Sequence, residues 1–267
     1  MKKIVRNCLG LASMMALPLM FTSCGEFDNP LENLPSSTVP TPYSVDITTA
    51  TGDITIESDG AVISGEPDDY YTLYIKDGVH EVTFSDIKDG PGLGPAVRIV
   101  CNGDVTLNLK NENSIRDINT NGHTVTINAS DATNKLFVSS TGSFTPITGN
   151  GTIKIEGGKL VATSPNTINA IECDVIVTGG VLRAHCQGSG SSIYGDLTVS
   201  GSGAVYIGGN SDVTGKAVSG TVTGAYDYNP DTHSWSTEKL NGTSTDKHSV
   251  STDNSAAPTD TDNWAVI

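Results

Sequence analysis

Short stretches in which apolar and polar residues alternate recur along residues 45–224 of the chain. One stretch reads Cys-Asp-Val175-Ile-Val, and a later one reads Gly-Asp-Leu197-Thr-Val. A period of two residues places every second side chain on the same face of a β-strand, so the apolar set is expected to face a core. Helical periodicity of useful length is absent from the sequence. The pattern therefore predicts an all-β protein.

The stretches recur at a spacing of twenty-odd residues, with steps of 28, 23, 20, 28, 22, 22 and 21 between their first apolar positions. These positions are Ile54, Val82, Val105, Val125, Ile153, Val175, Leu197 and Val218. A β-sandwich also has short strands and frequent turns, but a phrase repeated at nearly fixed spacing is typical of a solenoid. We therefore predict a right-handed parallel β-helix of about eight coils, each with three short strands separated by glycine-containing corners.

The N-terminus has the features of an export signal. Lys2, Lys3 and Arg6 precede a short apolar stretch that ends at Phe21-Thr22-Ser23-Cys24. The stretch is too short and too interrupted to span a membrane as a helix. Its end resembles the cleavage site of bacterial lipoproteins, although Phe21 stands where leucine is usual. This resemblance implies a signal peptide over residues 1–23 and a lipid on Cys24; an ordinary signal peptide cut elsewhere is the alternative.

The predicted signal is followed by three further regions. Residues 24–44 are polar and proline-rich and are expected to tether the lipid to the β-helix domain at 45–224. Residues 225–267 depart from the repeat and are predicted to form a C-terminal cap and a flexible polar tail. Acidic residues soon after Cys24 resemble the surface-export signal of Bacteroidetes lipoproteins, which implies the outer face of the outer membrane, with contact to the membrane through the lipid alone.

The net charge narrows the range of binding partners. Loss of the signal would leave 12 basic and 30 acidic residues, a net charge of −18, which repels nucleic acid and anionic membrane surfaces.

Cys101, Cys173 and Cys186 would remain with Cys24 after cleavage. An oxidising compartment permits one disulfide plus one thiol, and three buried thiols are equally compatible with the sequence.

The repeats resemble a family of bacterial β-helix lipoproteins that bind carbohydrates, one of which binds polygalacturonate. The shared phrase is Ala-Ile-Glu-Cys-Asp-Val-Ile-Val-Thr-Gly-Gly-Val-Leu-Arg-Ala at residues 170–184. The resemblance implies polysaccharide binding by a β-helix. The family's acidic pair beside the corner is replaced here by residues 166–169 and 188–191, which contain no acid, so calcium-dependent pectin binding does not follow from the resemblance.

Two aspartates at equivalent positions are the candidate metal ligands. Asp174 and Asp196 enter strands of consecutive coils, and stacking in register would place them about 5 Å apart. Carboxylates at that distance repel each other, so either a cation such as calcium lies between them or each bonds to the backbone of its own corner. The second arrangement is the more common use of aspartate at a corner.

Outward aromatic side chains are the candidate sugar-binding groups, since sugar rings stack on aromatic faces beside polar neighbours. Tyr74 and Tyr206 each lie between two apolar residues that are predicted to face inward, and Tyr194 lies at a corner. Arg183 is predicted to face outward on the strand that follows Asp174. The three tyrosines and Arg183 are therefore the candidate ligand contacts.

Three functional hypotheses follow from the sequence. The favoured one is a non-catalytic surface lipoprotein that binds polysaccharide or acts as an adhesin, with calcium as the candidate cofactor. The second is a structural lipoprotein of the cell envelope that presents loops to an outer-membrane protein partner. The third is a β-helix polysaccharide lyase or hydrolase, for which the sequence offers no clear catalytic residue beyond Arg183 and Asp174.

Overall fold

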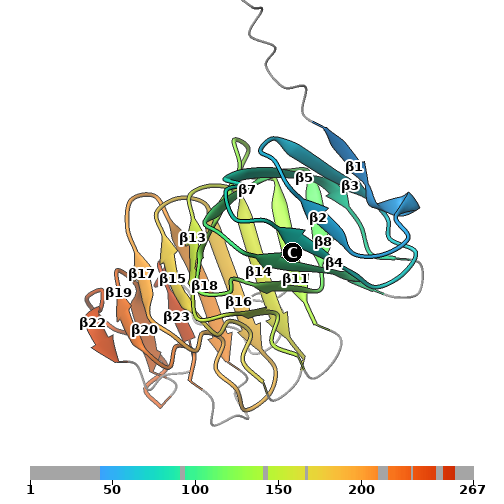
Figure 1. Ribbon diagram of the computed structural model, residues 1–267. Coiled ribbons are helices and arrows are strands. Elements are labelled where there is room, and N and C mark those ends of the chain that lie inside the picture. Colours follow the sequence, from blue (N-terminus) through green and yellow to red (C-terminus); the bar gives the residue numbers. More distant parts are fainter. Residues whose placement is uncertain are drawn as a thin grey trace, which may run out of the picture. The chain divides into compact units, whose positions relative to one another are not determined.

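Among the described residues, short β-strands account for almost all of the regular structure, with one turn of 3-10 helix, η1 (Ile47–Thr49). The computed structural model describes residues 43–90, 94–140, 144–165, 168–209, 216–229, 231–244 and 249–255. The predicted signal peptide, Cys24, nearly all of the tether and the end of the tail lie outside the described residues. The strands form three sheets that run side by side through the molecule (Figure 1).

Sheet 1 is the longest of the three and contains ten strands among the described residues. Neighbouring strands are parallel except for the last, β22, which runs antiparallel to β19. In spatial order its strands are β1 (Ser44–Asp46), β3 (Ala61–Gly65), β5 (Glu81–Ile87), β7 (Val105–Lys110), β10 (Thr124–Asn128), β13 (Thr152–Ile155), β15 (Asp174–Val177), β17 (Leu197–Val199), β19 (Thr221–Thr223) and β22 (Asn241–Ser244).

Sheet 2 shortens along the chain until single residues replace its strands. Its strands are β2 (Ile54–Ile56), β4 (Tyr71–Ile75), β6 (Val97–Cys101), β9 (Asp117–Asn119) and β12 (Ile147–Thr148), all parallel. Beyond β12 the same ladder continues as isolated parallel bridges through Ile171, Ile193 and Val218.

Sheet 3 begins only at β8 and ends in the C-terminal cap. Its parallel part consists of β8 (Glu112–Ile115), β11 (Lys135–Ser139), β14 (Lys159–Ser164), β16 (Val181–Cys186) and β18 (Ala204–Gly209). The cap adds β23 (Ser249–Ser251), β20 (Tyr226–Asn229) and β21 (Ser234–Trp235) in antiparallel pairing. Of these strands, β23 covers the edge of β18, which would otherwise expose unpaired backbone groups.

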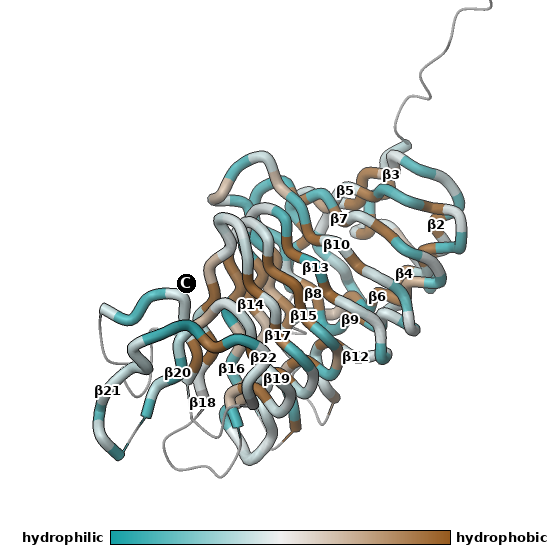
Figure 2. The backbone as a smooth tube through the Cα atoms, turned by 90° about the vertical axis from the view of Figure 1, so that its left-hand side faces the viewer, coloured by the Kyte–Doolittle hydropathy of each residue, from teal (hydrophilic) through white to brown (hydrophobic). Residues whose placement is uncertain are grey.

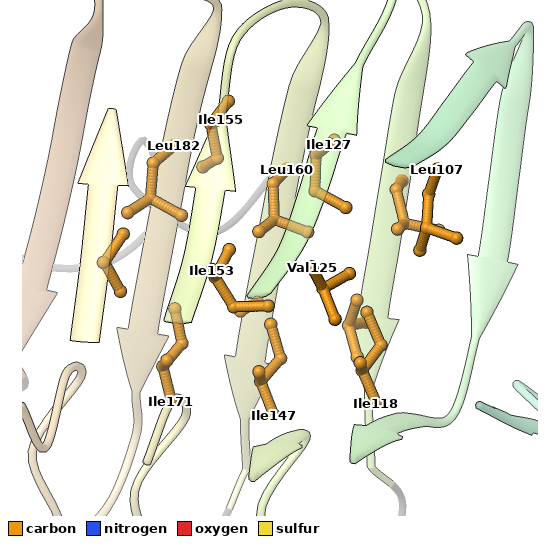
Figure 3. Close-up of a cluster of buried hydrophobic side chains, with 14 of the residues drawn as sticks. Leu107, Ile118, Val125, Ile127, Ile147, Ile153, Ile155, Leu160, Ile171 and Leu182 are labelled. Carbon is orange, nitrogen blue, oxygen red and sulfur yellow. The ribbon is translucent and has the colours of Figure 1, made fainter. Parts of the chain in front are cut away.

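The core is built from columns of apolar side chains that stack from coil to coil. In sheet 1 the column passes through Val105, Val125, Ile153, Val175, Leu197 and Val222, all at most 3% exposed. In sheet 2 it passes through Ile118, Ile147, Ile171 and Ile193, all fully buried. Figure 3 shows parts of these columns, and Figure 2 shows the apolar positions recurring along successive strands. Each buried Ile, Leu or Val side chain contributes roughly 1.5–3 kcal/mol relative to exposure.

The predicted parallel β-helix is confirmed, with about seven turns instead of eight. The repeated apolar positions belong to two different sheets. Ile54 and Val218 lie in the ladder of sheet 2, whereas Val125 and its equivalents lie in sheet 1. Both kinds of strand have the same local alternation, so the sequence pattern does not separate them.

The first coils also differ from the predicted three-strand pattern. Among the described residues before β8, strands alternate between sheets 1 and 2 and none belongs to sheet 3. The connections after β3 and β5 carry Pro67 and Pro95, and proline cannot donate to a ladder. The open edge of β8 is covered by the end of β5, where the backbone N–H of Ile87 donates to Oδ1 of the buried Asn113 (3.1 Å).

Candidate functional site

The aspartates that enter the strands of sheet 1 join each coil to the next. Oδ1 of Asp174 accepts the backbone N–H of Asp196 (2.9 Å), and Oδ1 of Asp196 accepts the backbone N–H of Thr221 (2.7 Å). Asp104 makes the equivalent bond to Thr124 at 2.8 Å. Asp174 and Asp196 therefore lie on consecutive rungs, as predicted, but each bonds to the following coil and not to its own corner.

A groove lies at the corner between sheets 2 and 1, beside Asp174. We call it the corner groove; its volume is about 460 Å³, and it is lined by Asn150, Gly151, Asn169, Glu172, Cys173, Asp174 and Tyr194. The Tyr194 side chain is 59% exposed, because it follows the buried Ile193 at the turn out of sheet 2. The groove therefore brings together Tyr194 and Asp174, two of the residues that the sequence singled out.

The polar groups of the corner groove are held in place by neighbouring residues. Nδ2 of Asn169 donates to Oε1 of Glu172 (2.9 Å), and Oδ1 of Asn169 accepts the backbone N–H of Ser191 (2.7 Å). Burial raises the pKa of the Cys173 thiol to about 12, so this thiol is neutral at physiological pH. The groove thus offers one exposed aromatic ring, two carboxylates and two amides. Glu172, Asn169 and Asn150 were not predicted, because their convergence depends on the corner conformation.

Arg183 and Tyr206 lie together on the outer face of sheet 3. They are register partners on β16 and β18, and the Arg183 guanidinium lies over the Tyr206 ring at 5.2 Å from its centre. The same row continues through Val161 and Phe137, and Lys135 lies over the Phe137 ring at 5.0 Å. The sequence predicted that Arg183 and Tyr206 face outward but did not predict their contact.

A larger groove lies over the first strands of sheet 3 and is called here the sheet-3 groove. It has a volume of about 860 Å³. Phe137, Ser114 and Thr163 line it from the sheet, while Asp86 and Asp89 line it from the chain around the end of β5. The charged residues that line it are four acids, Glu66, Asp86, Asp89 and Glu112, and one lysine, Lys88.

Tyr74 lies apart from the other candidates. It is 37% exposed on the outer face of β4, between Leu73 and Ile75, which are each 1% exposed. Tyr194 belongs to the same side of the molecule but follows Ile193, five steps along the sheet-2 ladder, or about 24 Å at the usual strand spacing. The two tyrosines therefore do not share a site.

A cluster that the sequence analysis missed lies on sheet 2. Asp117 is 8% exposed and lies between two arginines, with Nε of Arg98 at 3.0 Å and Nε of Arg116 at 2.8 Å from its oxygens. The Arg116 guanidinium also lies over the ring of Tyr70 at 5.4 Å. Arg98 and Asp117 are register partners, so an alignment of Ile99 with Ile118 would have revealed the pair.

The described residues contain no group of three or more His, Cys, Asp or Glu side chains that could hold a metal ion. Asp174 and Asp196 contribute two carboxylates on consecutive rungs, each with Oδ1 already engaged by backbone, so the calcium site stays a prediction. Cys101, Cys173 and Cys186 are all buried thiols, which corresponds to the alternative of three thiols.

No helix among the described residues is long and apolar enough to cross a membrane.

The fold and the sites above define the class of the protein as a parallel β-helix with several polar and aromatic surfaces on its outer faces. No protein-family model, curated protein or solved structure matches the chain.

Proposed function

We propose that the protein is a non-catalytic lipoprotein, anchored through Cys24 in the outer membrane and exposed at the cell surface, that binds polysaccharide. The observation that carries the proposal is the corner groove. Tyr194, the most exposed of the candidate tyrosines, lies in this groove beside Glu172, Asp174 and two asparagine amides. An exposed aromatic ring with converging polar groups is the usual composition of a sugar site.

The groove suits a sugar because its parts have separate roles. The Tyr194 ring offers an apolar face to the C–H face of a sugar, while the carboxylates and amides accept and donate hydrogen bonds with the hydroxyls. The hydrogen bonds of Asn169 to Glu172 and Ser191 fix the polar groups before ligand arrives. A preorganised site loses less conformational entropy on binding.

The arrangement of the charged candidates also favours binding over lyase chemistry. Arg183 lies on the outer face of sheet 3, and Asp174 lies at the start of a strand of sheet 1. A base and an acidic cluster acting on one sugar would have to lie within hydrogen-bond reach of the same ring. Arg183 and Asp174 therefore lie on different surfaces and do not form one catalytic site.

The first experiment is retention of the mature chain, carrying Cys24→Ser so that it stays in solution, on a panel of neutral and acidic polysaccharides. Each polysaccharide is tested with calcium and with chelator. Tyr194→Ala is expected to weaken retention about tenfold, as for a central aromatic contact, whereas Tyr74→Ala, on a different part of the molecule, leaves it unchanged. Loss of retention in chelator would assign calcium to Asp174 and Asp196, with Asp174→Asn as the variant that tests it.

Two results would contradict the proposal. Retention on no polysaccharide under either condition would overturn it and leave an outer-membrane protein partner as the remaining hypothesis. Shortened products on incubation with a retained polysaccharide would instead favour an enzyme. The anchor is tested separately in cells: wild-type protein is expected to incorporate a labelled fatty acid and to be cleaved by external protease, and the Cys24→Ser variant is expected to lose the label.

A further inference from the structure

Three cationic side chains lie on three successive strands of sheet 3, on its outer face. Lys135 is on β11, Lys159 is its register partner on β14, and Arg183 is on β16. Arg183 is two residues beyond Val181, the register partner of Lys159, so it lies diagonally across from Lys159 on the same face. We call these three residues the basic strip.

The basic strip is electrostatically unfavourable as it stands. Like charges directly opposite on neighbouring strands repel each other. Burial, and then the charges of Arg183 and Lys135, lower the pKa of the Lys159 ammonium below its ordinary value. Lys135 is paired with Glu112 at 2.7 Å, but within the described part of the chain no carboxylate forms an ion pair with Lys159. This clustering occurs in a chain with 30 acidic and only 15 basic residues. An anionic ligand would relieve the repulsion.

Two aromatic rings extend the basic strip along the same face. Lys135 lies over Phe137 and Arg183 lies over Tyr206, at 5.0 and 5.2 Å from the ring centres. Between them Val161 is 1% exposed although it points outward, so the surface around it is closely packed. A ligand along this row would meet alternating cationic and aromatic groups, which suits a charged sugar polymer.

The number of donors indicates the kind of anion. A planar carboxylate has two oxygens and is matched by a single guanidinium. Two ammonium groups and one guanidinium on three strands are better matched by an oxyanion with three free oxygens, such as a sulfate ester. The sheet-3 groove, with its carboxylates, adjoins the strip at Glu112 and Phe137. We therefore expect the anion to lie over Lys159, with Lys135 on one side of it and Arg183 on the other.

We propose that the basic strip binds the sulfate-ester groups of a sulfated polysaccharide, directly and without calcium. This inference rests on the proposed function, because it names the chemical class of the polysaccharide and adds a second contact surface to the corner groove.

The test compares chondroitin sulfate with unsulfated chondroitin, which has the same carboxylates, by calorimetric titration of the mature Cys24→Ser chain in chelator. Chondroitin sulfate is expected to bind at least tenfold more tightly than unsulfated chondroitin. Added salt is expected to weaken the binding of the sulfated polymer. Lys159→Gln should lower its affinity roughly tenfold, as for the loss of one charge-assisted hydrogen bond. Lys154→Gln, which removes a lysine from the outer face of sheet 1, is the matched control and should leave the affinity unchanged.

The outcomes separate this inference from the proposed function. Three results would overturn the proposal that the basic strip binds sulfate esters while leaving polysaccharide binding intact. They are equal binding of both polymers, a requirement for calcium, and full binding by Lys159→Gln. Binding to vesicles of phosphatidylglycerol, without preference for the sulfated sugar, would assign the strip to a membrane and also overturn the inference. Failure to bind any neutral, carboxylated or sulfated polysaccharide would overturn both proposals. Melting curves of each variant establish that it is folded.

Discussion

The Oδ1 atom of Asp174 accepts the backbone N–H of Asp196 at 2.9 Å, so a side chain at the start of one coil holds the backbone of the next. Asp196 repeats the arrangement with Thr221. Gly220 lies directly against this bond, since a Cβ there would collide with Oδ1 of Asp196. Gly195, which precedes Asp196, is equally close to the preceding coil, because a Cβ there would collide with the carbonyl oxygen of Cys173. Successive coils therefore approach each other closely at this corner.

Replacement of Asp174 tests whether the carboxylate acts as an acceptor or as a charge. Asp174→Ala is expected to lower the free energy of unfolding by about 1 kcal/mol, as for the loss of a helix-capping side chain, because the Asp196 N–H loses its partner. Asp174→Asn keeps an acceptor oxygen and is expected to cost only a few tenths of that value. Urea unfolding of both variants measures the difference; equal losses would mean that the negative charge, and not the hydrogen bond, matters at this position.

The sheet-2 ladder predicts a contrast between two isoleucines of the same coil. Ile171 is fully buried between Ile147 and Ile193, whereas Ile176 faces outward on β15 and is only half-buried. Ile171→Ala should lower the free energy of unfolding by about 2–5 kcal/mol because it leaves a cavity in a stacked column. Ile176→Ala should cost less than about 1 kcal/mol. Similar losses in urea unfolding would show that the column does not carry the stability of this coil.

The core of sheet 1 was predictable because strict alternation survives in every coil from Val105 to Leu197. The sheet to which each stretch belongs was less predictable, since Ile54 and Val218 have the same local pattern in a different sheet. The late start of sheet 3 could not be predicted either, because a missing strand leaves no periodic signal, only prolines and acidic residues that also suit an ordinary loop.

Candidate site residues could be identified one at a time from the sequence, but the contacts that group them into sites could not. Alternation predicts that Tyr206 and Arg183 face outward, but their contact depends on the register between β16 and β18. The approach of Tyr194 to Asp174 depends on a corner, where the side-chain direction is set by backbone angles that no periodicity reports. The Arg98–Asp117 pair joins residues 19 positions apart and becomes visible only when the sheet-2 column is aligned.

The Asp117 cluster is expected to stabilise the early coils. Asp117→Asn removes the charge between Arg98 and Arg116 and leaves two guanidinium groups close together. The expected loss is about 1–3 kcal/mol in the free energy of unfolding, below the cost of breaking a fully buried pair, because both arginines remain partly in water. Glu112→Gln is the control: it breaks the more exposed pair with Lys135 and should cost less than about 1 kcal/mol. An equal effect of the two changes in urea unfolding would contradict a special role for Asp117.

The buried thiols predict a loss of stability at alkaline pH. Burial raises the pKa of Cys101 and of Cys173 to about 12, against about 8.5 for a thiol in an unfolded chain. A raised folded-state pKa means that the folded chain keeps a proton which the unfolded chain releases. The stabilisation is therefore complete below about pH 8.5 and is lost as the pH rises toward 12, by about 1.4 kcal/mol per pH unit for each thiol.

Cys101→Ala isolates one thiol. Between about pH 7.5 and 10.5 the free energy of unfolding of this variant should fall by about 2–3 kcal/mol less than that of the wild type, because one titrating group is absent from the unfolded chain. Subtraction of each protein's own value at pH 7.5 removes the packing cost of the substitution. Parallel curves for the two proteins would mean that the Cys101 thiol titrates alike in both states, and rapid labelling of the folded wild type by a thiol reagent would confirm that it is accessible.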